Sequence, residues 1–163
     1  MTDAKNSNAF DARHVSLLWA TVEDADELAR CHASLFSEAW NAQSFAQLLS
    51  HPGSTSLVAC HGNPRKIVGF IVAQLAADEA EILTFGVAAD WQRKGLGRRL
   101  IEGLRRAAQR GEAKRLFLEV ADDNVPALVL YSRMGFKDVN RRKDYYSRAD
   151  GGKADALVLT LAL

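Results

Sequence analysis

Residues 82–110 of the chain read ILTFGV (82–87), AADWQRKGLG (88–97) and RRLIEGLRRAAQR (98–110). The first segment is a short apolar run typical of a strand, and the last repeats apolar residues at helical spacing. Gly95 and Gly97 therefore lie where a strand turns into a helix. Such a turn can point several backbone N–H groups at one place, beside the positive end of the helix dipole. The stretch predicts a cradle for an oxyanion or a pyrophosphate.

Two familiar nucleotide-binding motifs also place a glycine-rich turn between a strand and a helix. The sequence of this turn matches neither of them. The dinucleotide-binding fingerprint needs a third glycine at position 100, where the chain has Leu100. The P-loop needs Lys and then Ser or Thr after its second glycine, and Arg98 and Arg99 stand there instead. What remains is a turn of another class, Gln92-x-x-Gly95-x-Gly97.

Apolar periodicity and turn residues predict strands and helices along the whole chain. The strands are expected over residues 15–20, 56–60, 67–75, 81–87, 116–120, 136–146 and 156–163. The helices are expected over residues 21–35, 41–50, 96–110 and 124–134. This order is β-α-α-β-β-β-α-β-α-β-β. Hairpins combined with helical crossovers favour an α/β fold whose sheet contains both strand directions.

The composition is that of a single globular domain. With 163 residues, 48% of them hydrophobic and 25% charged, the chain is long enough to bury its own core. We expect one domain over residues 14–163, preceded by a polar, flexible tail over residues 1–13. No apolar run approaches the roughly 20 residues of a membrane helix, and the first residues lack the apolar segment of a secretion signal. These features predict a cytoplasmic protein that does not bind membranes.

The cysteines, the histidines and the charge distribution narrow the function further. Cys31 and Cys60 have neither metal-ligand spacing nor a disulfide framework, and the four histidines are scattered, so no metal is expected. Residues 1–92 contain 5 Lys and Arg against 11 Asp and Glu, whereas residues 93–163 contain 16 against 9. This asymmetry can steer an anionic ligand to the second half. The basic half lacks the interleaved aromatic residues of a nucleic-acid binder, so no nucleic-acid partner is expected.

Two motifs resemble those of the GNAT N-acetyltransferases. The first, similar to the acetyl-coenzyme A motif of that superfamily, runs from Val87 through Gln92-Arg93-Lys94-Gly95-Leu96-Gly97-Arg98 to Leu100. The second is Leu118-Glu119-Val120 followed by Asn124, Ala127, Leu130-Tyr131 and Gly135-Phe136. The resemblance implies a mixed, mostly antiparallel twisted sheet flanked by helices. It also implies acetyl-CoA as cosubstrate.

The resemblance assigns the residues that bind acetyl-CoA. The pyrophosphate would lie against the backbone N–H groups of Arg93, Lys94, Gly95, Leu96, Gly97 and Arg98. The pantetheine arm would pair with the strand that ends Phe85-Gly86-Val87, where Gly86 suits a bulge that splays this strand from its neighbour. The N–H near Val87 would stabilise the oxyanion of the reaction intermediate. A simple packing requirement explains Gly86 equally well.

Glu119 and Glu81 are the two candidates for the base. Glu119 lies inside an otherwise apolar strand, where a carboxylate either faces solvent or is held in a cleft with a raised pKa. The matching family position favours Glu119 as the group that takes the amine proton. Glu81 is the rival, because many relatives use an acidic residue on the strand before the glycine turn.

Asn124 and Tyr131 are seven residues apart and so share one face of the predicted helix. Asn124 can cap this helix and contact the cofactor arm at the same time. Tyr131 is either a core aromatic residue or, as the resemblance implies, the acid that protonates the leaving thiolate.

Within the superfamily the chain is most similar to the bacterial ribosomal-protein alanine N-acetyltransferases. The similarity lies in Arg141-Arg142-x-x-Tyr145-Tyr146, Asp150-Gly151 and Asp155-Ala156. It implies that Tyr145 and Tyr146 line a groove that admits only a chain terminus, with Trp40 in the opposite wall. Packing of Trp40 against Phe45 at the start of a helix is an equally good explanation. Relatives often have Pro-Trp-Ser where this chain has Ala39-Trp40-Asn41.

The sequence therefore predicts an acetyl-CoA-dependent enzyme that acetylates the N-terminus of a protein by direct transfer in a ternary complex. The resemblance implies that its acceptor is the N-terminal alanine of the eighteenth protein of the small ribosomal subunit. A GNAT enzyme acting on a small amine or on a lysine side chain is the first alternative. A non-catalytic module that binds acetyl-CoA or the ribosome is the second.

Overall fold

A computed structural model of the chain describes residues 11–163. Most of the tail expected over residues 1–13 lies outside the described residues, so that expectation stays a prediction. The described part opens with a 3-10 turn, η1 (Ala12–His14), whose cap is the Asp11 carboxylate accepting the Arg13 N–H. The guanidinium of Arg99 donates hydrogen bonds to the carbonyls of Ala12 and Val15. These bonds tie the start of the described chain to a helix far along the sequence.

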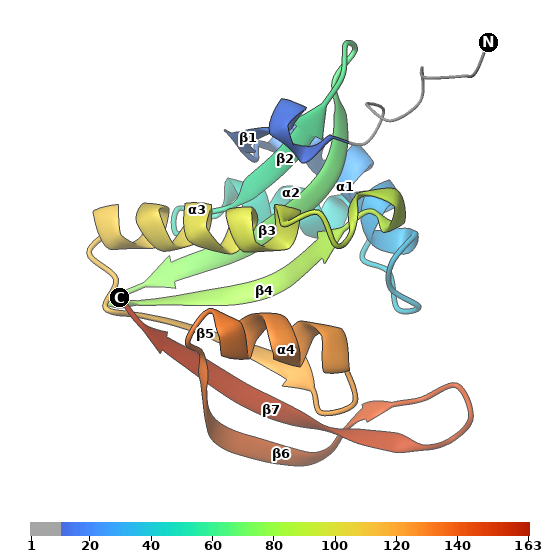
Figure 1. Cartoon of the computed structure of the whole chain (residues 1–163), viewed down its shortest axis with the longest axis vertical. Coiled ribbons are helices and arrows are strands. Elements are labelled where there is room, and N and C mark those ends of the chain that lie inside the picture. Colours follow the sequence, from blue (N-terminus) through green and yellow to red (C-terminus); the bar gives the residue numbers. More distant parts are fainter. Residues whose placement is uncertain (1–10) are drawn as a thin grey trace, which may run out of the picture. The chain divides into compact units, whose positions relative to one another are not determined.

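The described residues form seven strands and four α-helices in the predicted order (Figure 1). The strands are β1 (Ser16–Trp19), β2 (Leu57–His61), β3 (Lys66–Ala76), β4 (Glu79–Val87), β5 (Arg115–Ala121), β6 (Lys137–Ser147) and β7 (Lys153–Ala162). The helices are α1 (Ala25–Ala33), α2 (Ala42–Ser50), α3 (Leu96–Arg110) and α4 (Val125–Arg133), with further 3-10 turns η2 (Val22–Asp24) and η3 (Ala89–Trp91). The order β-α-α-β-β-β-α-β-α-β-β is confirmed.

The sheet is mixed and mostly antiparallel, as expected. Its strand order is β1-β2-β3-β4-β5-β7-β6. β4 and β5 pair in parallel, from Glu79 opposite Arg115 to Ile82 opposite Leu118. The pairs β1–β2, β2–β3, β5–β7 and β6–β7 are antiparallel. The chain also divides into two compact units, to which β3, β4 and α3 each contribute residues.

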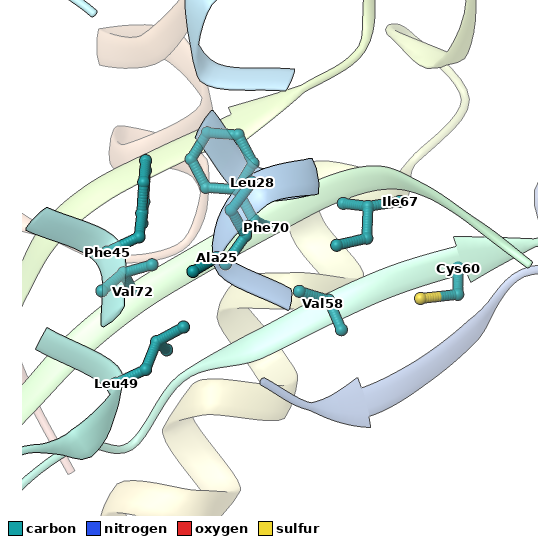
Figure 2. Close-up of a cluster of buried hydrophobic side chains, with 9 residues drawn as sticks. All are labelled: Ala25, Leu28, Phe45, Leu49, Val58, Cys60, Ile67, Phe70 and Val72. Carbon is teal, nitrogen blue, oxygen red and sulfur yellow. The ribbon is translucent and has the colours of Figure 1, made fainter. Parts of the chain in front are cut away.

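The first unit comprises the described residues up to Val72 together with residues 84–104. Its core lies where α1 and α2 pack against each other and against β2 and β3. The buried side chains at its centre, drawn as sticks in Figure 2, are Ala25, Leu28, Phe45, Leu49, Val58, Cys60, Ile67, Phe70 and Val72. Phe45, Leu28 and Phe70 have no exposed surface, so this cluster is closely packed.

Local capping sets where the two helices of this unit begin. Thr21 and Asp24 form a capping box before α1, with the Asp24 carboxylate accepting the Thr21 N–H at 2.8 Å. Asn41 caps α2, its side-chain oxygen accepting the Ser44 N–H at 2.8 Å. These short-range bonds satisfy N–H groups that the first turn of a helix leaves without partners.

The second unit comprises residues 73–83 and 105–163. β7 lies between β5 and β6 and pairs with both along most of its length. Its buried side chains come mainly from β5 and β7: Leu116, Leu118, Val120, Ala154, Ala156, Leu157, Leu159 and Leu161. α4 begins at its Asn124 cap, carries Pro126 in its first turn, and is followed by Gly135 at φ 90°. Proline in the first turn and glycine just after the last turn are common signals for the start and the end of a helix.

β6 departs from regular pairing at two places in its hairpin with β7 (Figure 1). Asp138 lies opposite Leu159 and Asn140 opposite Val158, so Val139 is an extra residue on β6. A second irregularity lies between Arg142, opposite Ala156, and Tyr146, opposite Ala154. After one inserted residue, the following side chains of a strand lie on the opposite face of the sheet. After two inserted residues, they lie on the original face again.

Candidate active site

The turn predicted to bind an anion has the backbone conformation that glycine favours. η3 ends at Trp91, and both Arg93 and Gly95 adopt positive φ, 59° and 78°, before α3 begins. A Cβ on Gly95 would meet no atom within 4 Å, so the left-handed backbone, rather than crowding, is what favours glycine there. The Gln92 side-chain amide donates a hydrogen bond to the Val87 carbonyl at 2.9 Å, which ties the turn to the end of β4.

The start of α3 offers the donors that an anion needs. The Arg99 N–H donates to the Gly95 carbonyl at 3.1 Å. The Arg99 N–H is thus the first helical donor, and three N–H groups of the helix precede it: those of Leu96, Gly97 and Arg98. The exposed side chains beside them are basic: Arg93, Lys94 and Arg98. Backbone donors, the helix dipole and exposed cations together fit the pyrophosphate of a coenzyme.

Gly86, near the end of β4, is required by its neighbours. A Cβ at this position would lie 2.8 Å from the Leu35 Cδ1 and 2.9 Å from the Phe70 Cζ. Phe70 belongs to the buried cluster of Figure 2 and has no exposed surface. The packing explanation for Gly86 is therefore sufficient by itself. A role of Phe85, Gly86 and Val87 in binding the cofactor arm stays a prediction.

Within the second unit, Glu119 and Arg142 form an ion pair. The Arg142 Nη2 lies 3.0 Å from the Glu119 Oε1. Glu119 is paired with Val158 of β7, and Arg142 is paired with Ala156 two residues away on the same strand. Because alternate residues of a strand share a face, the two side chains project from the same face of the sheet.

Glu81 lies on this face as well. It is paired with Phe117, two residues before Glu119 on β5. Partial burial is the main cause that raises the pKa of the Glu81 carboxyl, and the negative charge of Glu119 raises it further. The positive charge of Arg142 opposes both effects. The structure therefore places the two candidate bases on one face of the sheet, together with a cation that is paired with Glu119.

The hairpin tyrosines flank this charged group. Tyr146 is paired with Ala154 and so shares the face of Arg142. Burial raises the pKa of the Tyr146 phenol, and the charge of Glu119 adds to that shift. Tyr145 is half exposed, lies edge-to-face with Tyr146 at 5.1 Å, and has the Arg142 guanidinium 5.5 Å from its ring centre. We name Glu81, Glu119, Arg142, Tyr145 and Tyr146 the hairpin cluster.

α4 supplies the two remaining predicted residues. The Asn124 side-chain oxygen accepts the Ala127 N–H at 3.4 Å, so its capping role is confirmed. Tyr131 is buried, and its ring centre lies 5.4 Å from that of Phe136. Burial raises the pKa of the Tyr131 phenol far above its usual value, with a further contribution from Tyr146. The raised pKa keeps the Tyr131 phenol protonated at neutral pH.

Trp40 belongs to an aromatic cluster in the first unit. Its ring centre lies 5.7 Å from that of Phe45, the fourth residue of α2, as in the hydrophobic staple considered from the sequence. It also stacks on the buried His32 ring at 5.3 Å. Trp40 thus has a structural role, and its predicted contact with the acceptor stays a prediction.

Two residues of these clusters are not predicted from the sequence: His32 in the Trp40 cluster and Arg142 in the hairpin cluster. His32 was counted among scattered histidines, although it is the buried centre of the Trp40 cluster. In the sequence, Arg142 stands out only as part of the stretch Arg141-Arg142-x-x-Tyr145-Tyr146. Nothing in that stretch predicts its ion pair with Glu119. The sequence signal for His32 is its position eight residues before Trp40, the aromatic residue that precedes the second predicted helix. No local signal distinguishes Arg142 from Arg141.

Two negative findings apply to the described residues. No three His, Cys, Asp or Glu side chains among residues 11–163 are grouped as metal ligands. In the same part of the chain, no helix has the length and apolar character needed to cross a membrane.

Comparison with known proteins identifies the family. Residues 18–136 match the Acetyltransferase (GNAT) family. The chain belongs to the GNAT acetyltransferase family. This GNAT protein is 32% identical over 146 residues to the [ribosomal protein bS18]-alanine N-acetyltransferase of Escherichia coli strain K12, covering 88% of this chain and 96% of that one. It is 31% identical to the enzyme of the same name from Haemophilus influenzae, covering 74% of this chain and 82% of the relative.

A solved structure gives the same assignment for the fold. The crystal structure of the ribosomal-protein-S18-alanine N-acetyltransferase from Escherichia coli superimposes with a TM-score of 0.84 at 26% identity. The match covers 91% of this chain and 93% of that one. The GNAT fold predicted from the two motifs is confirmed. This GNAT protein is an N-acetyltransferase with acetyl-CoA as its cosubstrate. Binding of acetyl-CoA at the glycine turn before α3 stays a prediction.

Proposed function

We propose that this GNAT enzyme acetylates the α-amine of a protein, and that its acceptor is the N-terminal alanine of a ribosomal protein of the bS18 type. The similarity to the Escherichia coli bS18-alanine N-acetyltransferase, which extends over 88% of the chain, is the observation that carries this proposal. The hairpin cluster supports it, because two carboxylates beside two tyrosines suit a small cationic amine. We place this reaction in the cytoplasm, where ribosomal proteins are made.

In the proposed reaction the enzyme's own residues handle two protons and one developing charge. Acetyl-CoA supplies the acetyl group as an activated thioester. Glu119 accepts the proton that leaves the attacking amine, and Glu81, with its raised pKa, is the alternative acceptor. The backbone N–H at Val87 stabilises the carbonyl oxyanion. Tyr131 donates a proton to the departing sulfur, a role that fits a buried phenol that stays protonated.

The cysteines support direct transfer of the acetyl group to the amine. Burial raises the pKa of the Cys31 thiol to about 11. Burial also raises the pKa of Cys60, against the opposing effect of Arg65. Since the thiolate is the nucleophile, neither cysteine is a good carrier of an acetyl group at neutral pH. The proposed path therefore runs through a ternary complex.

A panel of peptides tests the acceptor. The peptides share one sequence without lysine and differ only in the first residue, and thiol release from acetyl-CoA is measured for each. We expect kcat/KM to be highest for the peptide that begins with alanine. The controls are the same peptide with a blocked N-terminus and a blocked peptide that carries one internal lysine. Faster turnover of the lysine peptide than of the alanine peptide would disprove the proposal.

A further inference from the structure

We propose that the Arg142 guanidinium occupies, in the free enzyme, the place of the acceptor's ammonium group, and that the two cations exchange when the acceptor binds. Arg142 is then a positioning residue that sets the affinity of the site for cationic amines. This inference rests on the proposed function, since it concerns how the hairpin cluster receives an α-amine.

The first support is the position of Arg142. Its guanidinium lies 3.0 Å from Glu119, the carboxylate that the sequence motif places at the base position. The pairing of β5, β7 and β6 puts both residues on one face of the sheet, with Ala156 and Val158 of β7 between them. These two β7 residues carry no charge, so no other group of β7 competes for Glu119 at this place.

The second support is the charge balance of the hairpin cluster. Burial raises the pKa of the Glu81 carboxyl, the negative charge of Glu119 raises it further, and the positive charge of Arg142 lowers it. Arg142 has the same effect on Tyr146. Two carboxylates in one partly buried group require a cation nearby. An incoming ammonium supplies that cation equally well, so the site stays neutralised when Arg142 leaves.

The third support is the ease with which Arg142 can leave. Its side chain is 54% exposed, whereas that of Glu119 is 21% exposed. The guanidinium also lies over the ring of Tyr145, which is itself half exposed. A guanidinium at this border can move into water, and its own exposure limits the free energy that is lost when the ion pair opens. The exchange therefore requires no change of the fold.

The test compares the substitution R142Q with R141Q. Arg141 is the neighbouring residue of β6 and has equally exposed ion pairs, with Asp155 at 2.8 Å and Asp122 at 3.1 Å, away from Glu119. At neutral pH we expect R142Q to lower the KM for an alanine-starting peptide by about two- to fivefold, because no resident cation competes. R141Q should leave this KM unchanged, and R142K, which keeps the cation, should restore it.

A second readout does not depend on turnover. The Glu81 carboxyl is titrated by carbon NMR in the free enzyme and with alaninamide as a minimal cationic amine. R142Q should raise the pKa of Glu81, and alaninamide should then lower it again. If the wild-type enzyme acetylates no N-terminal peptide, the proposed function fails, whereas this titration still measures the exchange of cations.

Two results would overturn the inference. A higher KM in R142Q than in R141Q would mean that Arg142 contacts the acceptor directly. Equal KM values together with an unchanged titration of Glu81 would mean that the ion pair has no part in binding.

Discussion

The Nδ1 atom of His32 accepts a hydrogen bond from the backbone N–H of Trp40 at 3.2 Å. The imidazole is 2% exposed and stacks on Phe36 at 4.3 Å and on Trp40 at 5.3 Å. Burial lowers the pKa of His32, so the ring is neutral at physiological pH and Nδ1 is free to accept. One buried histidine thereby holds the segment between α1 and α2, where the acceptor wall at Trp40 is predicted.

The substitutions H32N and H32L separate the hydrogen bond from the packing. Both remove the stacked ring, but the Asn side-chain oxygen can take the place of Nδ1 as acceptor. We expect H32L to be less stable than H32N by about 0.5–1.5 kcal/mol, the usual value of one such bond. Urea unfolding measures the difference. Equal stabilities would show that the Trp40 N–H finds another partner.

The buried His32 also predicts how stability depends on pH. Its folded-state pKa lies below the unfolded value of about 6.5, so the unfolded chain binds more protons between these two values. The stability of the wild-type protein should therefore fall as the pH drops below about 6.5, and more steeply than that of H32N. Thermal unfolding of both proteins from pH 7.5 to pH 5 checks this. Parallel curves for the two proteins would contradict the expectation.

The contribution of Glu81 to stability should depend on pH in the opposite direction to that of His32. Because its folded-state pKa is raised, the folded protein binds the extra proton between the unfolded and the folded pKa. Stability is therefore lost as the pH rises across this interval, and the loss is complete above the folded-state pKa. E81Q should therefore be more stable than the wild type at neutral pH, and the gain should shrink as the pH falls through the Glu81 pKa. The melting temperature of both proteins against pH provides the measurement. A neutral-pH loss of stability in E81Q would exclude this account.

The two carboxylates differ in their expected kinetic effect. Loss of a general base lowers turnover by about 10²- to 10⁴-fold, so E119Q should lose activity in this range if Glu119 is the base. E81Q should then lose much less, because the base remains. It should also move the acid limb of the pH–rate profile, because it removes a carboxyl of raised pKa that titrates beside Glu119 in the wild type. Unchanged turnover in E119Q, with a large loss in E81Q, would transfer the role to Glu81.

Substitution of Tyr131 should lower turnover by a factor that does not depend on pH. Its phenol stays protonated because burial raises its pKa, so Tyr131 cannot produce an alkaline limb in the working range. Y131F should lower kcat by about 10²-fold or more, with the shape of the pH–rate profile retained. The KM values for both substrates should change little. A profile that loses its alkaline limb in Y131F would show that Tyr131 titrates in the native enzyme.

Gly95 and Gly151 form a matched pair for testing the glycine turn. Both have positive φ, 78° and 83°, and a Cβ on either would meet no atom within 4 Å. Alanine should therefore cause a similar backbone strain of about 1–2 kcal/mol at each position. G95A alone should also raise the KM for acetyl-CoA, while G151A should leave that KM unchanged. Equal KM values for the two variants would mean that the glycine turn does not contribute to cofactor binding.

Much of the fold could be predicted because its signals are local. The capping box at Thr21 and Asp24, the Asn41 and Asn124 caps, and Gly135 each act within one helical turn, so their spacing alone identifies them. Apolar periodicity likewise predicted the order of strands and helices. The errors lie mainly at strand ends, such as β4, which begins at Glu79 rather than at Glu81.

The family, the glycine turn and the two candidate bases could be predicted because they depend on residue types at short spacing. Which arginine meets Glu119 depends instead on the pairing of strands that are distant in the sequence. The extra residue Val139 exchanges the faces of β6, and so Arg142 lies on the face of Glu119 while Arg141 pairs with Asp155. A bulge becomes visible only in the pairing of β6 with β7, two strands whose register depends on packing across the whole unit.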